Sequence, residues 1–235
     1  MDAISSDPTS RGDGPQRLER LGEEIVACRA CPRLVAWREQ VATERRAAFR
    51  DQNYWGRPVT GFGDPQARIV VVGLAPAAHG ANRTGRVFTG DRSGDWLFAA
   101  LHRAGLANQA RSVAVDDGLA LRDVWVGAAV RCAPPANKPT TEERDRCRGF
   151  LVRELDALAR RKVVVALGRF AYDIVTGLVG IRPRPAFGHG VEAPAPSGLM
   201  VVASYHPSQQ NTFTGTLSEA MFDAVISRAA VLATA

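Results

Sequence analysis

Four short runs of apolar residues alternate along the chain with longer segments in which apolar residues recur every three or four positions. Continuous apolar runs of this length predict strands that are buried on both faces, and the periodic segments predict helices. The predicted strands are RIVVVGL (68–74), DVWVGAAVR (123–131), KVVVALG (162–168) and LMVVASY (199–205). This alternation predicts an α/β fold, a three-layer α/β/α domain with a central, mainly parallel four-stranded sheet.

Local signals define several helices. A helix is expected to open at Ser93 with Asp95 in its first turn, and Thr140 with Glu143 matches a capping box at the start of the helix over 140–161. Further helices are predicted over 18–28, 169–179 and 217–233, and the first of these delivers Cys28. The aromatic, turn-rich stretch 53–68 is expected to be an ordered loop.

The length and composition predict one domain. With 235 residues, 46% of them hydrophobic, the chain can bury one sizeable core. Residues 1–16 are polar and are expected to be disordered, which leaves 17–235 as the domain. The N-terminus lacks the apolar region of a signal peptide and no apolar run is long enough to cross a bilayer, so we expect a soluble cytoplasmic protein.

A formal net charge of +6 favours an anionic partner such as nucleic acid. The alternative is that a chain so rich in arginine and alanine reflects a GC-rich genome. In parallel sheets, ligands bind beyond the carboxyl ends of the strands. That rule selects the loops 73–92, 131–140, 168–169 and 205–216. The first loop has neither the Lys and Ser or Thr of a phosphate-binding P-loop after Gly90 nor a dinucleotide fingerprint.

Four residues in these loops have side chains suited to chemistry, and each also has an ordinary structural interpretation. Phe88 is either a core residue or an aromatic platform for a flat ligand. Asp91 is either a helix cap or the one carboxylate placed for catalysis. His206 follows the last strand and precedes a proline, a position that suits a catalytic residue or a surface histidine. Asn137 offers a donor and an acceptor to the edge of a base, or satisfies a turn.

The four cysteines have a spacing that suits a metal. Cys28 and Cys31 form a C-x2-C pair, Cys132 follows a predicted strand, and Cys147 lies within a predicted helix. Four such sulfurs suit either tetrahedral zinc or a [4Fe-4S] cluster. The alternative is that they are ordinary buried residues, and a disulfide is disfavoured in the cytosol.

These residues together resemble a known family. The segments GLAPAAHGANRTGRVFTGD, VRCAPPANKP and YHPS, with the four cysteines, resemble the type 5 iron-sulfur uracil-DNA glycosylases, and CRACPRLVAWRE and YWGRPVTGFGD agree. The resemblance covers roughly residues 24–225. It implies a monofunctional DNA repair enzyme that hydrolyses the N-glycosidic bond of uracil, and of other deaminated or modified bases, leaving an abasic site for base excision repair.

The resemblance also implies roles for the motif residues. Phe88 stacks on the flipped base, Asn137 reads its edge, His206 donates to the pyrimidine O2, and backbone from Gly73 onward shapes the pocket floor. Many relatives carry a polar residue near the position of Ala75, and in the type 5 group Asp91 is the proposed substitute. The family's cluster is a structural [4Fe-4S] group, ligated here by Cys28, Cys31, Cys132 and Cys147.

The implied partner is DNA containing uracil or other deaminated bases, bound by a monomer that associates with the nucleoid. One alternative is a non-enzymatic metal-containing DNA-binding module, although convergence of Asp91, Asn137 and His206 at one sheet edge exceeds what binding requires. A second is a glycosylase that is covalently trapped on its product, but the basic insertion of such relatives is absent after His206. A third is a small-molecule nucleotide enzyme, which the missing phosphate loop disfavours.

Overall fold

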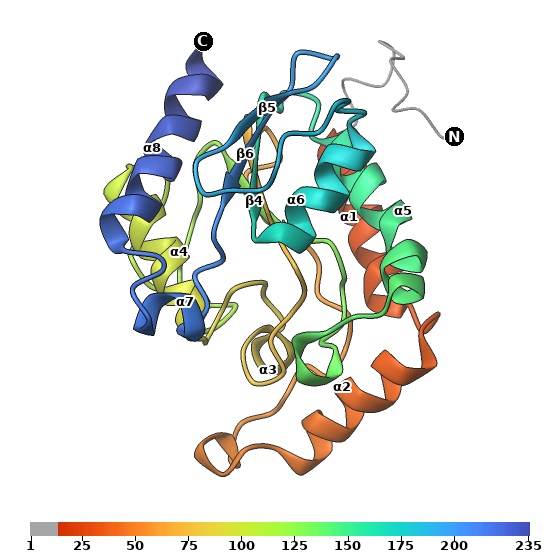
Figure 1. The fold of residues 1–235 in the computed structure, drawn as a ribbon. Coiled ribbons are helices and arrows are strands. Elements are labelled where there is room, and N and C mark those ends of the chain that lie inside the picture. The colour runs from red at the N-terminus through yellow and green to blue at the C-terminus, as the bar shows by residue number, and fades with distance from the viewer. Residues whose placement is uncertain (1–13) are drawn as a thin grey trace.

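The computed structural model describes residues 14–235, and a mixed sheet lies at its centre (Figure 1). Within this range the sheet has six strands in the order β1-β3-β2-β4-β6-β5. The four predicted strands are confirmed as parallel neighbours: β2 (Ile69–Gly73), β3 (Val124–Ala128), β4 (Val163–Leu167) and β6 (Met200–Ser204). Two short antiparallel edge strands were not predicted, β1 (Phe62–Gly63) and β5 (Glu192–Pro194).

Helices surround the sheet. The helices predicted from periodicity are present as α1 (Gly14–Ala27), α4 (Arg92–Arg103), α5 (Thr141–Ala157), α6 (Arg169–Leu178) and α8 (Glu219–Thr234). Three others lacked a sequence prediction: α2 (Pro32–Glu44), α3 (Ala81–Thr84) and α7 (Gln209–Phe213). Because α1 already begins at Gly14, residues 14–16 are helical rather than disordered, and residues 1–13 of that predicted segment lie outside the described residues.

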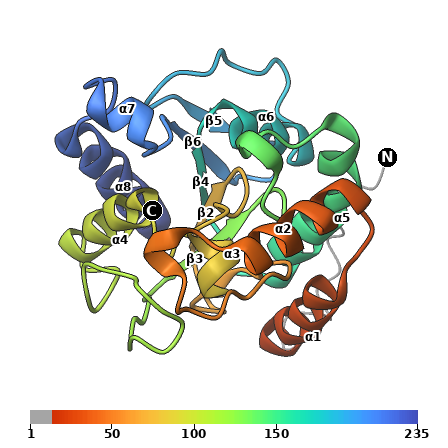
Figure 2. The same cartoon turned by 90° about the horizontal axis from the view of Figure 1, so that it is seen from below.

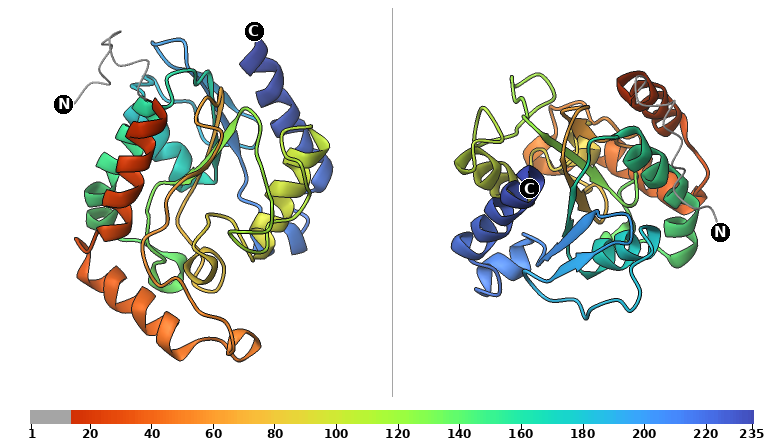
Figure 3. Two further views of the ribbon diagram at one scale, coloured as in Figure 1. Left: turned by 180° about the vertical axis from the view of Figure 1, so that it is seen from behind. Right: turned by 90° about the horizontal axis from the view of Figure 1, so that it is seen from above.

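The strands bury side chains on both faces, which explains their continuous apolar sequences. Val71 and Val165 belong to one apolar cluster, which the helices α4 and α8 complete. Val70 and Val164 point the other way into a second cluster with α1, α5 and α6. Figures 2 and 3 show the resulting layers, with the sheet between the two groups of helices. No helix within residues 14–235 has the length and apolar character needed to cross a membrane.

Side-chain caps begin two of the helices that follow the loops selected from the sequence. The predicted capping box of α5 is confirmed: Glu143 N–H donates to Thr140 Oγ1 at 3.2 Å, and Thr140 N–H donates to Glu143 Oε2 at 2.8 Å. Helix α4 begins at Arg92, one residue before the predicted Ser93, because Asp91 is its cap. The two caps fix where each loop ends.

The carboxyl ends of the four parallel strands point to one edge of the molecule, the lower edge in Figure 1. Helix α3 and helix α7 lie at this edge, and α2 runs across it when the molecule is seen from below (Figure 2). The loops selected from the sequence therefore converge on one side of the fold, as the rule for parallel sheets predicts.

Candidate active site

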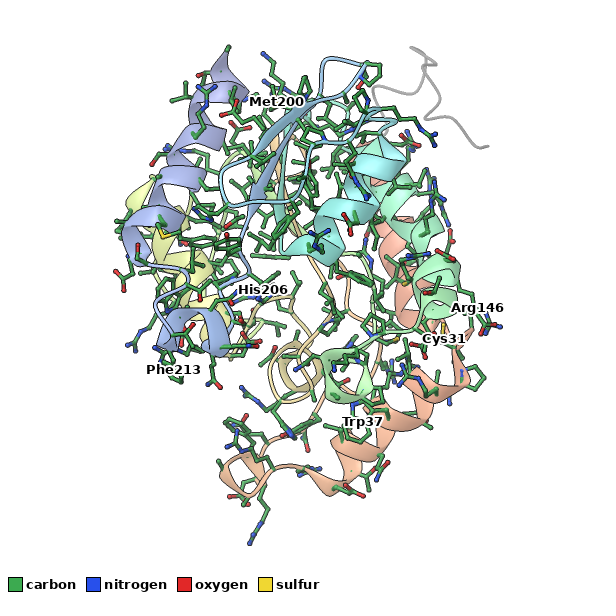
Figure 4. The ribbon with its side chains drawn as sticks, viewed as in Figure 1. Cys31, Trp37, Arg146, Met200, His206 and Phe213 are labelled. Atoms are coloured by element: carbon green, nitrogen blue, oxygen red, sulfur yellow. The ribbon has the colours of Figure 1, made fainter. Side chains whose placement is uncertain are left out.

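Phe88 and His206 meet at the carboxyl edge of the sheet. Their rings stack with centroids 6.0 Å apart and an interplanar angle of 27°. Phe88 comes from the loop after β2, and His206 comes directly after β6 (Figure 4). Two loops that are 118 residues apart in the sequence thus provide one aromatic surface.

Phe88 is held in place by its backbone and by a glycine beneath its ring. Its φ of +53° lies in the left-handed region, which a bulky side chain adopts at a cost of order 1–3 kcal/mol. A Cβ atom added to Gly73 would lie 2.6 Å from Phe88 Cζ, so the ring fits only because position 73 has no side chain. The ring is only 8% exposed. The core position of Phe88 is therefore confirmed, with the His206 ring stacked on it, and its role as a platform for a flat ligand stays a prediction.

Asp91 is confirmed as a helix cap. Its Oδ1 accepts a hydrogen bond from the N–H of Gly94 at 3.0 Å, and the carboxylate lies against Gly80, where a side chain would collide with it. Burial raises the pKa of Asp91 above its usual range, although the N–H groups of Gly94 and Ser93 favour the charged form. A carboxylate with a raised pKa accepts a proton more readily than an exposed one, which suits a general base.

His206 is a neutral imidazole at physiological pH. Burial lowers its pKa to about 4, because desolvation disfavours the charged ring. Its ring nitrogens make no hydrogen bond to any described residue, whereas its backbone oxygen accepts from Asn211 Nδ2 at 2.9 Å. Gly168, at the end of β4, leaves the space that the His206 side chain requires. The ring can therefore offer one N–H and one acceptor nitrogen to a ligand.

Asn137 lies in a short 3₁₀ helix of residues Pro135–Asn137 in the loop after β3. Its φ is +56° and that of Ala136 is +53°, so the backbone reverses sharply there. The Asn137 side chain is exposed and hydrogen-bonds to neither Phe88 nor His206, nor to any other residue that the structure describes. The structure brings Asn137 to the correct edge and leaves its amide free.

The four cysteines are free thiols and half-buried. Cys28 acts electrostatically on the pKa of each of the other three thiols, so the four belong to one neighbourhood that joins α2, the loop after β3 and α5. Among residues 14–235, no group of three or more Cys, His, Asp or Glu side chains is arranged to hold a single metal ion. Figure 4 shows Cys31 beside Arg146 at this end of the molecule.

Two of these sulfurs accept hydrogen bonds from N–H groups, one from an arginine side chain and one from the backbone. Arg38, which is 2% exposed, donates from Nη1 to Cys132 Sγ at 3.0 Å. The N–H of Arg131 donates to Cys147 Sγ at 3.3 Å, and the Arg131 guanidinium forms a fully buried pair with Glu154. N–H donors of this kind stabilise thiolate ligands, so the residues present fit an anionic metal-thiolate group.

The sequence interpretation missed two residues that order the site. Arg83 donates to the carbonyl oxygens of His79 at 2.7 Å and of Gly90 at 2.9 Å, and so joins both ends of the loop that carries Asp91. His189 accepts the N–H of Tyr205 at Nδ1, at 3.2 Å, and fixes the backbone next to His206. Both residues have ordinary surroundings in the sequence, so no local pattern could have indicated these contacts.

The carboxyl edge of this parallel sheet presents a stacked Phe–His pair, a half-buried carboxylate and a free amide. The family model that matches residues 60–230 is the uracil DNA glycosylase superfamily. The chain is 52% identical to the type-5 uracil-DNA glycosylase of Mycobacterium leprae over 223 residues, which are 94% of this chain and 97% of that relative.

Two further relatives show how far the similarity extends. The type-5 uracil-DNA glycosylase of Thermus thermophilus is 51% identical over 92% of this chain and 98% of its own length. The type-4 uracil-DNA glycosylase of Archaeoglobus fulgidus is 32% identical over 69% of this chain and 65% of its own length. The chain belongs to the uracil DNA glycosylase superfamily and, within it, to the type 5 group.

Proposed function

We propose that this protein is a DNA repair glycosylase that hydrolyses the N-glycosidic bond of uracil, and of other deaminated or modified bases, in DNA. The observation that carries the proposal is the stacked pair of Phe88 and His206 at the carboxyl edge of the sheet, next to the loop that ends at Asp91. The family membership supports the reaction class. We propose further that residues 17–235 act as one domain and as a monomer, in the cytoplasm at the nucleoid.

The first step is extrusion of the target nucleotide from the stack, which costs a few kcal/mol and less for a mispaired base. In our proposal the base lies against Phe88, the free amide of Asn137 reads its edge, and the backbone at Gly73 forms the floor. Stacking is independent of the base, whereas an amide with one donor and one acceptor discriminates between edges. Asn137 therefore provides the selectivity of the pocket.

Bond cleavage then develops negative charge on the leaving base and positive charge on the sugar. Neutral His206 donates its ring N–H to the base oxygen, and a preorganised donor of this kind contributes about 2.7–4 kcal/mol. Because the pKa of His206 is lowered to about 4, this donor acts by hydrogen bonding and does not need to transfer a proton. Asp91 stabilises the sugar cation or orients the attacking water with the oxygen that the Gly94 N–H leaves free.

We also propose that Cys28, Cys31, Cys132 and Cys147 ligate a [4Fe-4S] cluster. Each iron of a cubane takes one cysteine, so the four sulfurs stand further apart than they do around a single zinc ion. Cys28 influences the pKa of each of the other three thiols, which supports one shared site for the four sulfurs. When bound, the cluster supplies a structural crosslink between α2, the loop after β3 and α5, and it takes no part in the hydrolysis.

The test is release of uracil from an oligonucleotide that carries one deoxyuridine. The proposal predicts free uracil and an abasic site that breaks in alkali, with no strand break before alkali because the enzyme is monofunctional. Intact DNA that remains bound to the protein would support the metal-containing DNA-binding module instead. The panel should include hypoxanthine, xanthine and ethenocytosine in single and double strands, because an amide that reads an edge discriminates among these bases.

A further inference from the structure

The segment of residues 45–53, here called the basic arm, links α2 to the aromatic stretch that leads into β1. In Figure 2 it extends from the end of α2 past α3 toward α4, so it lies along the edge where the strand ends converge. Figure 1 shows the same segment as the lowest part of the molecule, beyond α3. The basic arm therefore stands beside the mouth of the proposed base pocket.

Three arginines of the basic arm have no acidic partner among residues 14–235. Arg46 and Arg50 are exposed and Arg45 is half-buried, and none of them forms an ion pair with a described carboxylate. Two acids are near in the sequence: Glu44 accepts a hydrogen bond from Gln40, and exposed Asp51, within the basic arm, forms no ion pair with a described residue. Exposed arginines elsewhere in residues 14–235 are of both kinds: Arg153 pairs with Glu24 and Arg228 with Glu192, whereas Arg182 forms no ion pair with a described carboxylate. The charge of the basic arm is therefore available to an external anion.

The conformation of the basic arm is fixed. Arg45 has a φ of +52°, its N–H donates to the Val41 carbonyl oxygen at 3.0 Å, and its Nη1 donates to the Arg50 carbonyl oxygen at 2.8 Å. A left-handed arginine costs of order 1–3 kcal/mol and persists only where the surroundings determine it. A rigid segment loses less conformational entropy when it binds a ligand than a flexible one does.

The basic arm is anchored directly to the loop that carries Asp91. Buried Arg83 donates from Nη1 to Gln52 Oε1 at 2.6 Å, and its guanidinium lies 4.0 Å from the centre of the Phe49 ring. The same guanidinium donates to the carbonyl oxygen of Gly90, the residue before Asp91. One buried side chain thus fixes the distance between the cations of the basic arm and the reactive loop.

A second anchor brings the charge of the basic arm close to the loop. Tyr54 Oη lies 3.1 Å from His79 Nδ1 and accepts a hydrogen bond from the Arg46 N–H at 3.4 Å. The positive charge of Arg46 also contributes to a lowered pKa of His79, after the larger effect of burial, so Arg46 lies within electrostatic reach of the loop. The Trp55 N–H adds a backbone bond to the Arg83 carbonyl oxygen at 2.9 Å.

We propose that the basic arm is a phosphate-binding surface for the DNA strand that delivers the target base, with Arg46 and Arg50 as its principal contacts. This inference rests on the proposed function, because it takes DNA as the partner. Arginine binds phosphate through charge and through its planar set of donors, and such contacts position a protein on DNA without reading sequence. The basic arm would therefore set the register in which the strand crosses the pocket.

The test is the salt dependence of binding to a duplex with a stable abasic-site analogue. Each phosphate contact to B-DNA adds about 0.9 to the slope of log K against log salt. In the double variant Arg46→Ala with Arg50→Ala, the magnitude of that slope should be smaller by about 2 than in the wild type. The Kd of the variant at low salt should be at least about tenfold higher. Excision at an enzyme concentration below the wild-type Kd should fall together with the affinity.

The matched control removes two charges from the opposite edge of the sheet. Arg160 and Lys162 precede β4, are exposed, and lie at its amino end. The double variant Arg160→Ala with Lys162→Ala should keep the wild-type slope. Equal slopes for the two double variants, or no measurable binding of DNA, would overturn the assignment. If the wild type releases uracil but the Arg46→Ala, Arg50→Ala variant keeps the wild-type slope, the phosphate-binding role of the basic arm is refuted and the proposed function stands. If the slope falls in that variant but the wild type releases no uracil, the proposed function is refuted and the phosphate-binding role stands.

Discussion

Phe88 shows how one residue can cost stability and serve the site. Its left-handed backbone and its buried ring are held by Gly73, and the Phe88 carbonyl oxygen lies so close to Gly94 that no side chain fits there. Natural proteins retain such strain where the surrounding structure requires it. The strain here places an aromatic face against His206, which an unstrained loop would not guarantee.

Replacing Gly73 by alanine should damage the pocket and spare the fold. The new Cβ would lie 2.6 Å from Phe88 Cζ, so the ring must move away from His206. Single-turnover uracil excision should fall at least about tenfold, equivalent to about 1.4 kcal/mol, with an unchanged circular dichroism spectrum. The control is Gly177→Ala in α6, where no atom lies within 4 Å of the added Cβ. Equal excision by the two variants would contradict the role of Gly73.

His206 should make stability depend on pH in the acid range. Its pKa is about 4 in the folded chain against about 6.5 when unfolded, so the unfolded chain binds a proton first as the pH falls. The contribution of His206 to the free energy of unfolding is complete above about pH 6.5. It falls by at most about 3 kcal/mol as the pH decreases from about 6.5 to 4.

The measurement compares urea unfolding of the wild type with that of His206→Gln across this range. Asp91, whose pKa is raised in the wild type, is present in both proteins, so the comparison isolates the contribution of His206. The wild type should lose stability relative to the variant as the pH falls from 6.5 to 4. A constant difference would show that His206 titrates like an exposed histidine.

At the scale of elements, prediction from the sequence succeeded where an element depends on its own residues. The four apolar runs became the parallel strands, and Thr140 with Glu143 capped α5 as expected. The edge strands β1 and β5 have only two and three residues, too few for a pattern. Helix α7 is also short, and its exposed Phe213 lies against the Arg92 guanidinium (Figure 4). Such short elements are stabilised by contacts with other segments of the chain, and a local sequence pattern does not indicate those contacts.

The cysteine-bearing elements should depend on iron. Purified protein should be brown, with a broad absorbance near about 400 nm and about four irons per chain. Cys147→Ser, in α5, should lower the iron content and the melting temperature together, because the link between α5 and the loop after β3 is lost. Iron analysis with thermal unfolding provides the measurement. Colourless protein that contains zinc would contradict the cluster.

At the scale of the whole molecule, the fold and the site differ in how far the sequence predicts them. The parallel sheet follows from alternation along the chain, and its carboxyl edge follows from topology. The hydrogen bonds that order the site cannot be predicted in this way. Arg83 bonds to Gln52, which is 31 positions away in the sequence, and His189 bonds to Tyr205, which is 16 positions away. Family motifs located Phe88, Asp91 and His206 in the sequence, but the structure was needed to show what orders them.

Asp91, in the loop between β2 and α4, is proposed to act in the reaction as well as to cap α4. The most direct test is single-turnover excision of uracil by Asp91→Asn with enzyme in excess over DNA. Asparagine keeps an oxygen that caps the helix, so the fold should persist while the charge is lost. The excision rate should be at least about tenfold lower, equivalent to about 1.4 kcal/mol, with unchanged affinity for abasic DNA. An unchanged rate would contradict it and leave Asp91 as a helix cap only.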